Sequence, residues 1–142
     1  MIVQKIIDSI AETLSGHFPD TEIYTEEAKQ GLNEPCFFIL PVDVSDIRHR
    51  GNRWLAEYTV CVQYIPSDNE PKARCAEVEE ILYKALEYVR IDGAAVGGMD
   101  IHSETTDEVL SFFVSYRMLT LETSEENADS MGEYTLNSQV KG

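Results

Sequence analysis

Two long segments of the chain, 54–65 and 110–121, alternate their side chains with a period of two. This is the period at which side chains point to opposite faces of a β-strand. The mainly apolar faces hold Tyr58, Val60, Val62 and Tyr64 in the first segment, and Leu110, Phe112, Val114, Tyr116 and Met118 in the second. Both segments predict strands with one buried face, so any fold of this chain must contain a sheet.

A second strand candidate precedes each of these segments across a short turn. The run from Cys36 to Val44 is rich in aromatic and branched side chains, which favour strands. Pro41 within this run predicts an edge position or a bulge. The segment 99–105 also alternates, and a turn at 106–108 separates it from the strand that follows. Each pair predicts a hairpin, and residues 22–25 could add a short strand.

Two other segments carry apolar residues at helical spacing. The first begins at Ile2, and a helix there should end near Gly16. The second should begin near Pro71 and continue to Val89, because Pro is favoured in the first helical turn. The apolar stripe that predicts its packing on the sheet is Cys75, Val78, Leu82, Ala85 and Val89. Residues 93–98 contain three glycines and predict a flexible connection to the next strand.

The order of these elements predicts an α+β fold, with a mainly antiparallel sheet of two hairpins and two helices packed on one face. A length of 142 residues is typical of one domain. The composition changes after Leu121, because residues 122–142 contain five acids and one base and few side chains suited to a core. We therefore expect a domain over 1–121 and an extended acidic C-terminal arm over 122–142.

Acidic residues outnumber basic ones by 26 to 11, and the formal net charge is −15. Such a surface repels phosphate, which argues against DNA-binding proteins and against adhesion to anionic lipid. A hydrophobic content of 43% excludes general disorder. No apolar run approaches the ~18 residues of a membrane span, and the first residues lack the features of a signal peptide. The cysteine count is odd and the spacing wide, which favours a reduced, intracellular protein.

Few residues are arranged for catalysis or metal binding. The best candidate is Asp100-x-His102-x-Glu104, because alternate residues of a strand share a face and could serve a metal-dependent hydrolase. The alternative is a solvated polar face. No CxxC, HExxH or GxSxG motif is present, and the cysteines lie among apolar residues, which indicates packing rather than nucleophilic catalysis. We therefore expect neither enzyme activity nor a cofactor.

A basic turn stands out against the acidic chain. Arg48, Arg50 and Arg53 lie within six residues, together with His49 and Asn52. One interpretation is a solvated hairpin tip. The functional interpretation is a docking loop for an acidic partner surface, including another copy of this chain, and contact with DNA phosphates ranks third because the overall charge opposes it.

The stretch from Ile23 to Ile39 matches the pattern I-Y-x-E-x-x-x-Q-G-x-x-x-P-C-F-F-I. In this it resembles a family of tail terminator proteins from phages and prophages of Gram-positive hosts. Gly51-Asn52-Arg53, Val62-x-Tyr64-x-Pro66 and the apolar face of 110–116 fall where that family has similar residues. The resemblance covers about 1–121, and its first segment is the most specific.

The resemblance implies a small α+β structural subunit that forms a ring, usually a hexamer, on the last ring of the tail tube. It would stop tube elongation and offer a surface to the head connector or collar, or close the tail of a headless contractile particle or bacteriocin. The implied partners are further copies, the tube protein, and sheath, connector or collar proteins, with DNA only as passing cargo. An acidic ring suits a channel through which DNA slides. The implied location is the tail of the particle, assembled in the bacterial cytoplasm.

The C-terminal arm has its own pattern near its end. Tyr134, Leu136 and Val140 alternate with polar residues, as in a strand that adds to the edge of a neighbouring sheet. The alternative is a disordered terminus. For the whole chain, an acidic monomeric binding module that mimics nucleic acid is a further alternative to the ring subunit.

Overall fold

The computed structural model describes residues 2–25, 33–48, 51, 53–67 and 69–121. Neither of the helices in this part of the chain is long and apolar enough to cross a membrane. The elements in chain order are α1 (Ile2–His17), β1 (Glu22–Tyr24), β2 (Cys36–Arg48), β3 (Arg53–Ile65), α2 (Pro71–Ala85), β4 (Tyr88–Ile91), β5 (Ala94–Thr106) and β6 (Val109–Leu121). The predicted α+β class is confirmed.

The described strands form one sheet in the order β1-β2-β3-β6-β5-β4. Strand β1 is parallel to β2, and every other neighbouring pair is antiparallel. The two predicted hairpins are β2–β3 and β5–β6, and both are confirmed. Strands β3 and β6 join the hairpins at the centre, with Val60 opposite Val114 and Val62 opposite Phe112.

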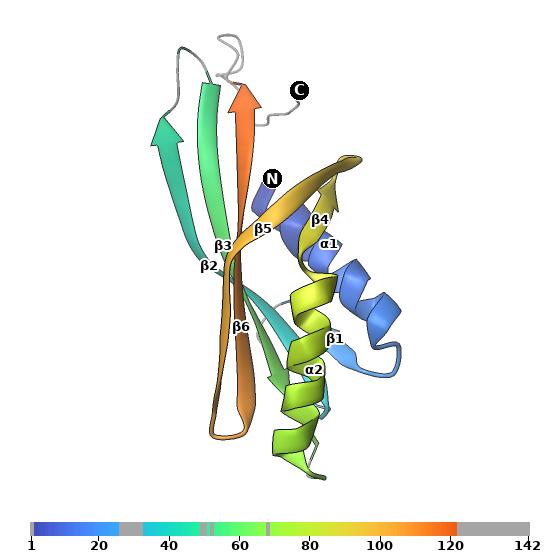
Figure 1. Cartoon of the computed structure of the whole chain (residues 1–142). Helices are drawn as coiled ribbons and strands as arrows, with labels where there is room; N and C mark the ends of the chain where they lie inside the picture. The colour runs from blue at the N-terminus through green and yellow to red at the C-terminus, as the bar shows by residue number, and fades with distance from the viewer. Residues whose placement is uncertain (1, 26–32, 49–50, 52, 68, 122–142) are drawn as a thin grey trace.

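Both helices cover the same face of the sheet (Figure 1). Burial of apolar surface between helices and sheet stabilises the fold, because it removes that surface from water. Helix α1 contributes Ile6, Ile10 and Leu14, all fully buried, and α2 contributes Leu82. The sheet contributes the two apolar faces that the sequence predicted, together with Phe37 and Ile39 of β2.

Helix α2 is shorter than predicted. It ends at Ala85, and the next residues turn into strand β4, so the predicted continuation to Val89 is wrong. Val89 is buried as expected, but it lies on a strand whose side chains alternate between exposed and buried. The helical spacing of the apolar residues could not reveal this end of α2. The step from Ala85 to Val89 fits a helix, although Val89 lies on a strand. Ala85, at the end of the helix, is only half-buried.

The predicted loop at 93–98 is also wrong, because all but Gly93 belong to β5. Strand β5 pairs with β4 through residues 94–97 and then with β6 from Gly98 onward. At the change of partner, the Gly98 N–H donates to the Glu87 carbonyl, with an N···O distance of 2.6 Å. A Cβ on Gly98 would lie 2.8 Å from Val114 Cγ2 and 3.1 Å from the Leu86 carbonyl oxygen. Only glycine permits this close approach.

Tyr116 connects the backbone just after α2 to the core. Its side chain is fully buried, and its hydroxyl donates to the Leu86 carbonyl at 2.8 Å. Burial raises the pKa of Tyr116, because water no longer stabilises the phenolate. The hydroxyl therefore stays a donor, and it satisfies a carbonyl just beyond the end of α2.

We predict that Leu82→Ala lowers the free energy of unfolding by about 2–5 kcal/mol, because it leaves a cavity in the core. Ile81→Ala is the matched control, since 37% of the Ile81 side chain is exposed and its loss should cost clearly less. Urea denaturation of both variants measures the difference. A loss below about 1 kcal/mol for Leu82→Ala would contradict the packing of α2 described here.

We also predict that Gly98→Ala destabilises the protein by about 1–3 kcal/mol, because the added methyl group collides with β6 and with the backbone after α2. Gly97→Ala is the control one residue away, where nothing lies within 4 Å of an added Cβ. It should be neutral or slightly stabilising, because alanine loses less conformational freedom on folding. Equal effects of the two substitutions in thermal unfolding would contradict the close approach at Gly98.

Candidate assembly surface

Three strands continue beyond the rest of the sheet. Residues 42–48 of β2, 53–59 of β3 and 116–121 of β6 form a three-stranded ribbon, which rises at the top of Figure 1. Strand β1 pairs with β2 only at residues 36–38, and β5 leaves β6 after the pair Gly98–Tyr116. Within the described residues, the ribbon therefore has two open edges, β2 on one side and β6 on the other.

A bulge marks the base of the ribbon on β2. The register between β2 and β3 shifts between Pro41 and Asp43, and Pro41 lies beyond the three residues that pair with β1. The bulge predicted for Pro41 is confirmed, whereas the alternative, an edge strand, is not, because β2 lies between β1 and β3 in the sheet. A bulge increases local twist, which turns the ribbon relative to the paired part of the sheet.

Large aliphatic side chains remain exposed on both edge strands of the ribbon. Val42 and Val44 on β2 are 52% and 51% exposed, and Leu119 on β6 is 53% exposed. A single exposed aliphatic residue is ordinary in a folded protein. Here such residues occur on both open strands of one ribbon, so each edge has exposed aliphatic surface that a further strand could cover.

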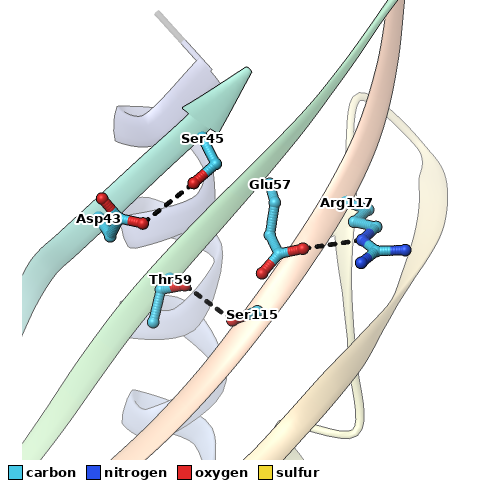
Figure 2. Close-up of polar contacts among 6 residues, drawn as sticks. All are labelled: Asp43, Ser45, Glu57, Thr59, Ser115 and Arg117. Carbon is cyan, nitrogen blue, oxygen red and sulfur yellow. Dashed lines mark hydrogen bonds and ion pairs between the residues drawn. The ribbon is translucent and has the colours of Figure 1, made fainter. Parts of the chain in front are cut away.

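Part of the sheet face turned away from the helices is polar, and its side chains pair with one another (Figure 2). The hydroxyls of Thr59 and Ser115 hydrogen-bond across β3 and β6 at 2.8 Å. Arg117 donates from Nε to a carboxylate oxygen of Glu57 at 2.8 Å. These pairs lie directly opposite each other in the register, so they fix the alignment of the two strands.

A third contact lies within the edge strand itself. The Ser45 hydroxyl donates to the Asp43 carboxylate at 3.1 Å (Figure 2). Both side chains are exposed on the same face as the Glu57–Arg117 pair. This face therefore offers hydroxyl and carboxylate groups that already have partners, and none of these described pairs is arranged as a nucleophile with its base.

The basic turn lies at the free end of the ribbon. Arg48 ends β2 and the exposed Arg53 begins β3, with Gly51 between them at a φ of +61°. The side chain of Arg48, and residues His49, Arg50 and Asn52, lie outside the described part of the structure. The C-terminal arm, with Tyr134, Leu136 and Val140, also lies outside it. A role of these residues in assembly stays a prediction.

The metal-site hypothesis loses its geometric basis in the structure. The register of β5 shifts between Met99 and His102, and Asp100 adopts a φ of +52°. This irregularity interrupts the alternation that would place Asp100, His102 and Glu104 on one face. The His102 ring instead stacks on Phe113, with centroids 4.9 Å apart. Among the described residues, no group of three or more His, Cys, Asp or Glu side chains could hold a metal ion.

The three cysteines are free and buried. Burial raises the pKa of the Cys36, Cys61 and Cys75 thiols, because the apolar surroundings disfavour the thiolate. The thiolate is the reactive form of cysteine, so these side chains act as packing groups. This agrees with the interpretation from the sequence.

A shallow pocket of about 220 Å³ lies where the start of α2 meets the ends of α1 and β3. It is lined by apolar groups that include Phe18, Val78 and Ile81. Its charged lining residues, Arg74 and Glu77, pair with each other at 3.1 Å, and their side chains are 56% and 66% exposed.

Sequence reasoning located the basic turn but missed the open edges of the ribbon. The edge of β6 is open only because β5 turns away to pair with β4, and the sequence interpretation had no strand β4. A signal was present in Tyr88–Ile91, whose side chains alternate before the turn at Gly93. Reading those four residues as a strand would have suggested a second partner for β5.

Comparison with known proteins identifies the family. The sequence profile of a family described as "Phage tail terminator protein" matches residues 5–128. No curated protein matches the chain. One solved structure is similar over 84% of this chain and 95% of its own length, with 15% identity and a TM-score of 0.40, which is too distant to carry an argument.

The profile match covers most of the chain and includes the segment Ile23–Ile39 on which the resemblance was based. It extends seven residues beyond Leu121, the last residue of the described sheet. The resemblance to tail terminator proteins is thus confirmed, and the chain belongs to the phage tail terminator family.

Proposed function

We propose that this chain is the ring subunit that caps the tail tube, ends its elongation and offers a surface to the head connector or collar. The family is a structural one, and membership of it indicates a structural role in the phage tail as a component of the virion. The observation that carries the finer proposal is the ribbon with two open edges. The proposed partners are further copies, the tube protein, and sheath, connector or collar proteins.

A closed ring needs two different surfaces on each subunit, because head-to-tail contacts join one patch to another. The ribbon supplies two such surfaces on opposite sides, the edge of β2 and the edge of β6. A hexamer is the ring size implied by the family resemblance. Rings of this kind would form in the bacterial cytoplasm, where tails assemble.

The net charge of −15 suits the channel of such a ring. DNA carries a dense negative charge, and a protein without a cluster of cations makes few lasting phosphate contacts. DNA would therefore pass as cargo without being retained. The basic turn between β2 and β3 is the exception, and we assign it to contact with an acidic protein surface on the tube or on the next copy.

We expect tails made without this chain to be abnormally long, because nothing then ends tube growth. Electron microscopy of particles from cells that lack the gene measures the length distribution. Expression of the intact chain in the same cells should restore a single length. Tails of normal length in its absence would refute the capping role.

We expect Arg50→Glu/Arg53→Glu to reduce the fraction of capped tails severalfold, because charge reversal places acids against an acidic partner. The matched control is Lys72→Glu/Lys84→Glu on α2, where both side chains are exposed. It makes the same change in net charge away from the ribbon.

Denaturation midpoints of both double variants should match that of the unchanged chain, since Arg53, Lys72 and Lys84 are exposed. Electron microscopy then compares tail lengths. If the arginine variant caps tails as well as the lysine variant does, the turn is only a solvated tip.

A further inference from the structure

The two open edges of the ribbon run in the same direction. Strands β2 and β6 are each antiparallel to β3, so they are parallel to each other. A copy related by rotation about a ring axis keeps the direction of its strands along that axis. The β6 edge of one copy would therefore meet the β2 edge of the next as a parallel pair, with evenly spaced, slanted hydrogen bonds.

The free stretches have only part of the usual protection of edge strands, because they contain charged residues (Asp43, Asp46, Arg48 and Arg117) but neither Lys nor Pro. An open edge presents unpaired N–H and C=O groups, and proteins commonly protect it with Lys, Pro or a bulge. On β2, Pro41 and the bulge lie at the base of the ribbon. Beyond that point, neither 42–48 nor 117–121 contains Lys, Pro or Gly. Both edges are thus suited to accept a further strand.

Charge favours a second copy as that partner. The three ribbon segments contain three acids and three bases, namely Asp43, Asp46, Glu57, Arg48, Arg53 and Arg117. Their formal sum is zero, so the whole net charge of −15 lies elsewhere in the chain. Two copies of so acidic a protein repel each other least where these ribbons meet.

We propose that β6 of one copy pairs in parallel with β2 of the next, so that the ribbons join into one continuous closed sheet around the ring. This inference rests on the proposed ring and assigns its interface. On the face away from the helices, Leu119 of one copy would lie beside the edge of β2 in the next, whose side chains on that face include Asp43 and Ser45. On the opposite face, Val44 would lie beside the neighbour's β6, which removes exposed aliphatic surface from water.

Disulfide trapping in assembled particles tests the pairing. Leu119→Cys is combined with Asp43→Cys or with Ser45→Cys, and particles are treated with a mild oxidant. Within one copy, β3 separates these positions by two strand spacings, roughly 10 Å, which is beyond the reach of a disulfide. A bond between them must therefore join two copies.

The expected result is a ladder of dimers and higher multiples on a non-reducing gel, which collapses on reduction. The control pair, Ser45→Cys with Glu104→Cys, places the second thiol in the part of β5 that pairs with β6 far from the ribbon, and should give no ladder. The unchanged chain controls for the three buried cysteines.

Two outcomes would overturn the inference. Normally capped tails without a ladder from either pair would show that the ring uses another interface, and would leave the capping role intact. A ladder from Ser45→Cys with Leu136→Cys instead would assign the β2 edge to the C-terminal arm. Tails of normal length in the absence of the gene would refute the proposed function itself, independently of the gels.

A charge placed on one edge gives a second measurement. Leu119→Lys should weaken association between copies about tenfold, because a lysine on an edge strand opposes strand addition. Tyr88→Lys is the matched control, since Tyr88 is 55% exposed on the terminal strand β4 and Leu119 is 53% exposed. Overlong tails with Leu119→Lys alone would support the pairing, and equal tail lengths for the two variants would overturn it.

Discussion

The pairing of β3 with β6 is the contact on which the rest of the molecule depends. It runs without interruption from Arg53 opposite Leu121 to Tyr64 opposite Leu110. Because side chains alternate with a period of two, a slip of one residue would move the core faces of both strands into solvent. The same register places Thr59 against Ser115 and Glu57 against Arg117 on the other face. One alignment therefore fixes both the core and the polar face of the ribbon.

Much of this was predictable from local pattern. The alternation of 54–65 and 110–121, the first helix and both hairpins follow from periods that single segments carry themselves. The end of α2 and the start of β4 were not predictable in this way, because Val89 continues a helical spacing while it lies on a strand. The change of partner in β5 depends on Gly98. Its close neighbours are Val114 on β6 and Leu86 just after α2, and both are distant from Gly98 in the sequence.

The candidate site was likewise predictable from the sequence only in part. Clustered arginines are visible in the sequence, so the basic turn was found. An open edge is the absence of a neighbour, and only the complete sheet order shows where β1 stops and β5 turns away. The predicted metal site at Asp100, His102 and Glu104 was wrong because the sequence alternates there, whereas the folded strand has a bulge that interrupts the alternation.

The departure of β5 at Gly98 separates the length of the ribbon from the stability of the core. Helices α1 and α2 pack against one face of the sheet, whereas the strand ends at the top of Figure 1 carry exposed side chains such as Val44 and Leu119. Residues added in matched pairs to β2, β3 and β6 beyond Pro41 would keep each side chain on its face, since the period is two. The length of the ribbon can therefore change while the same core is retained.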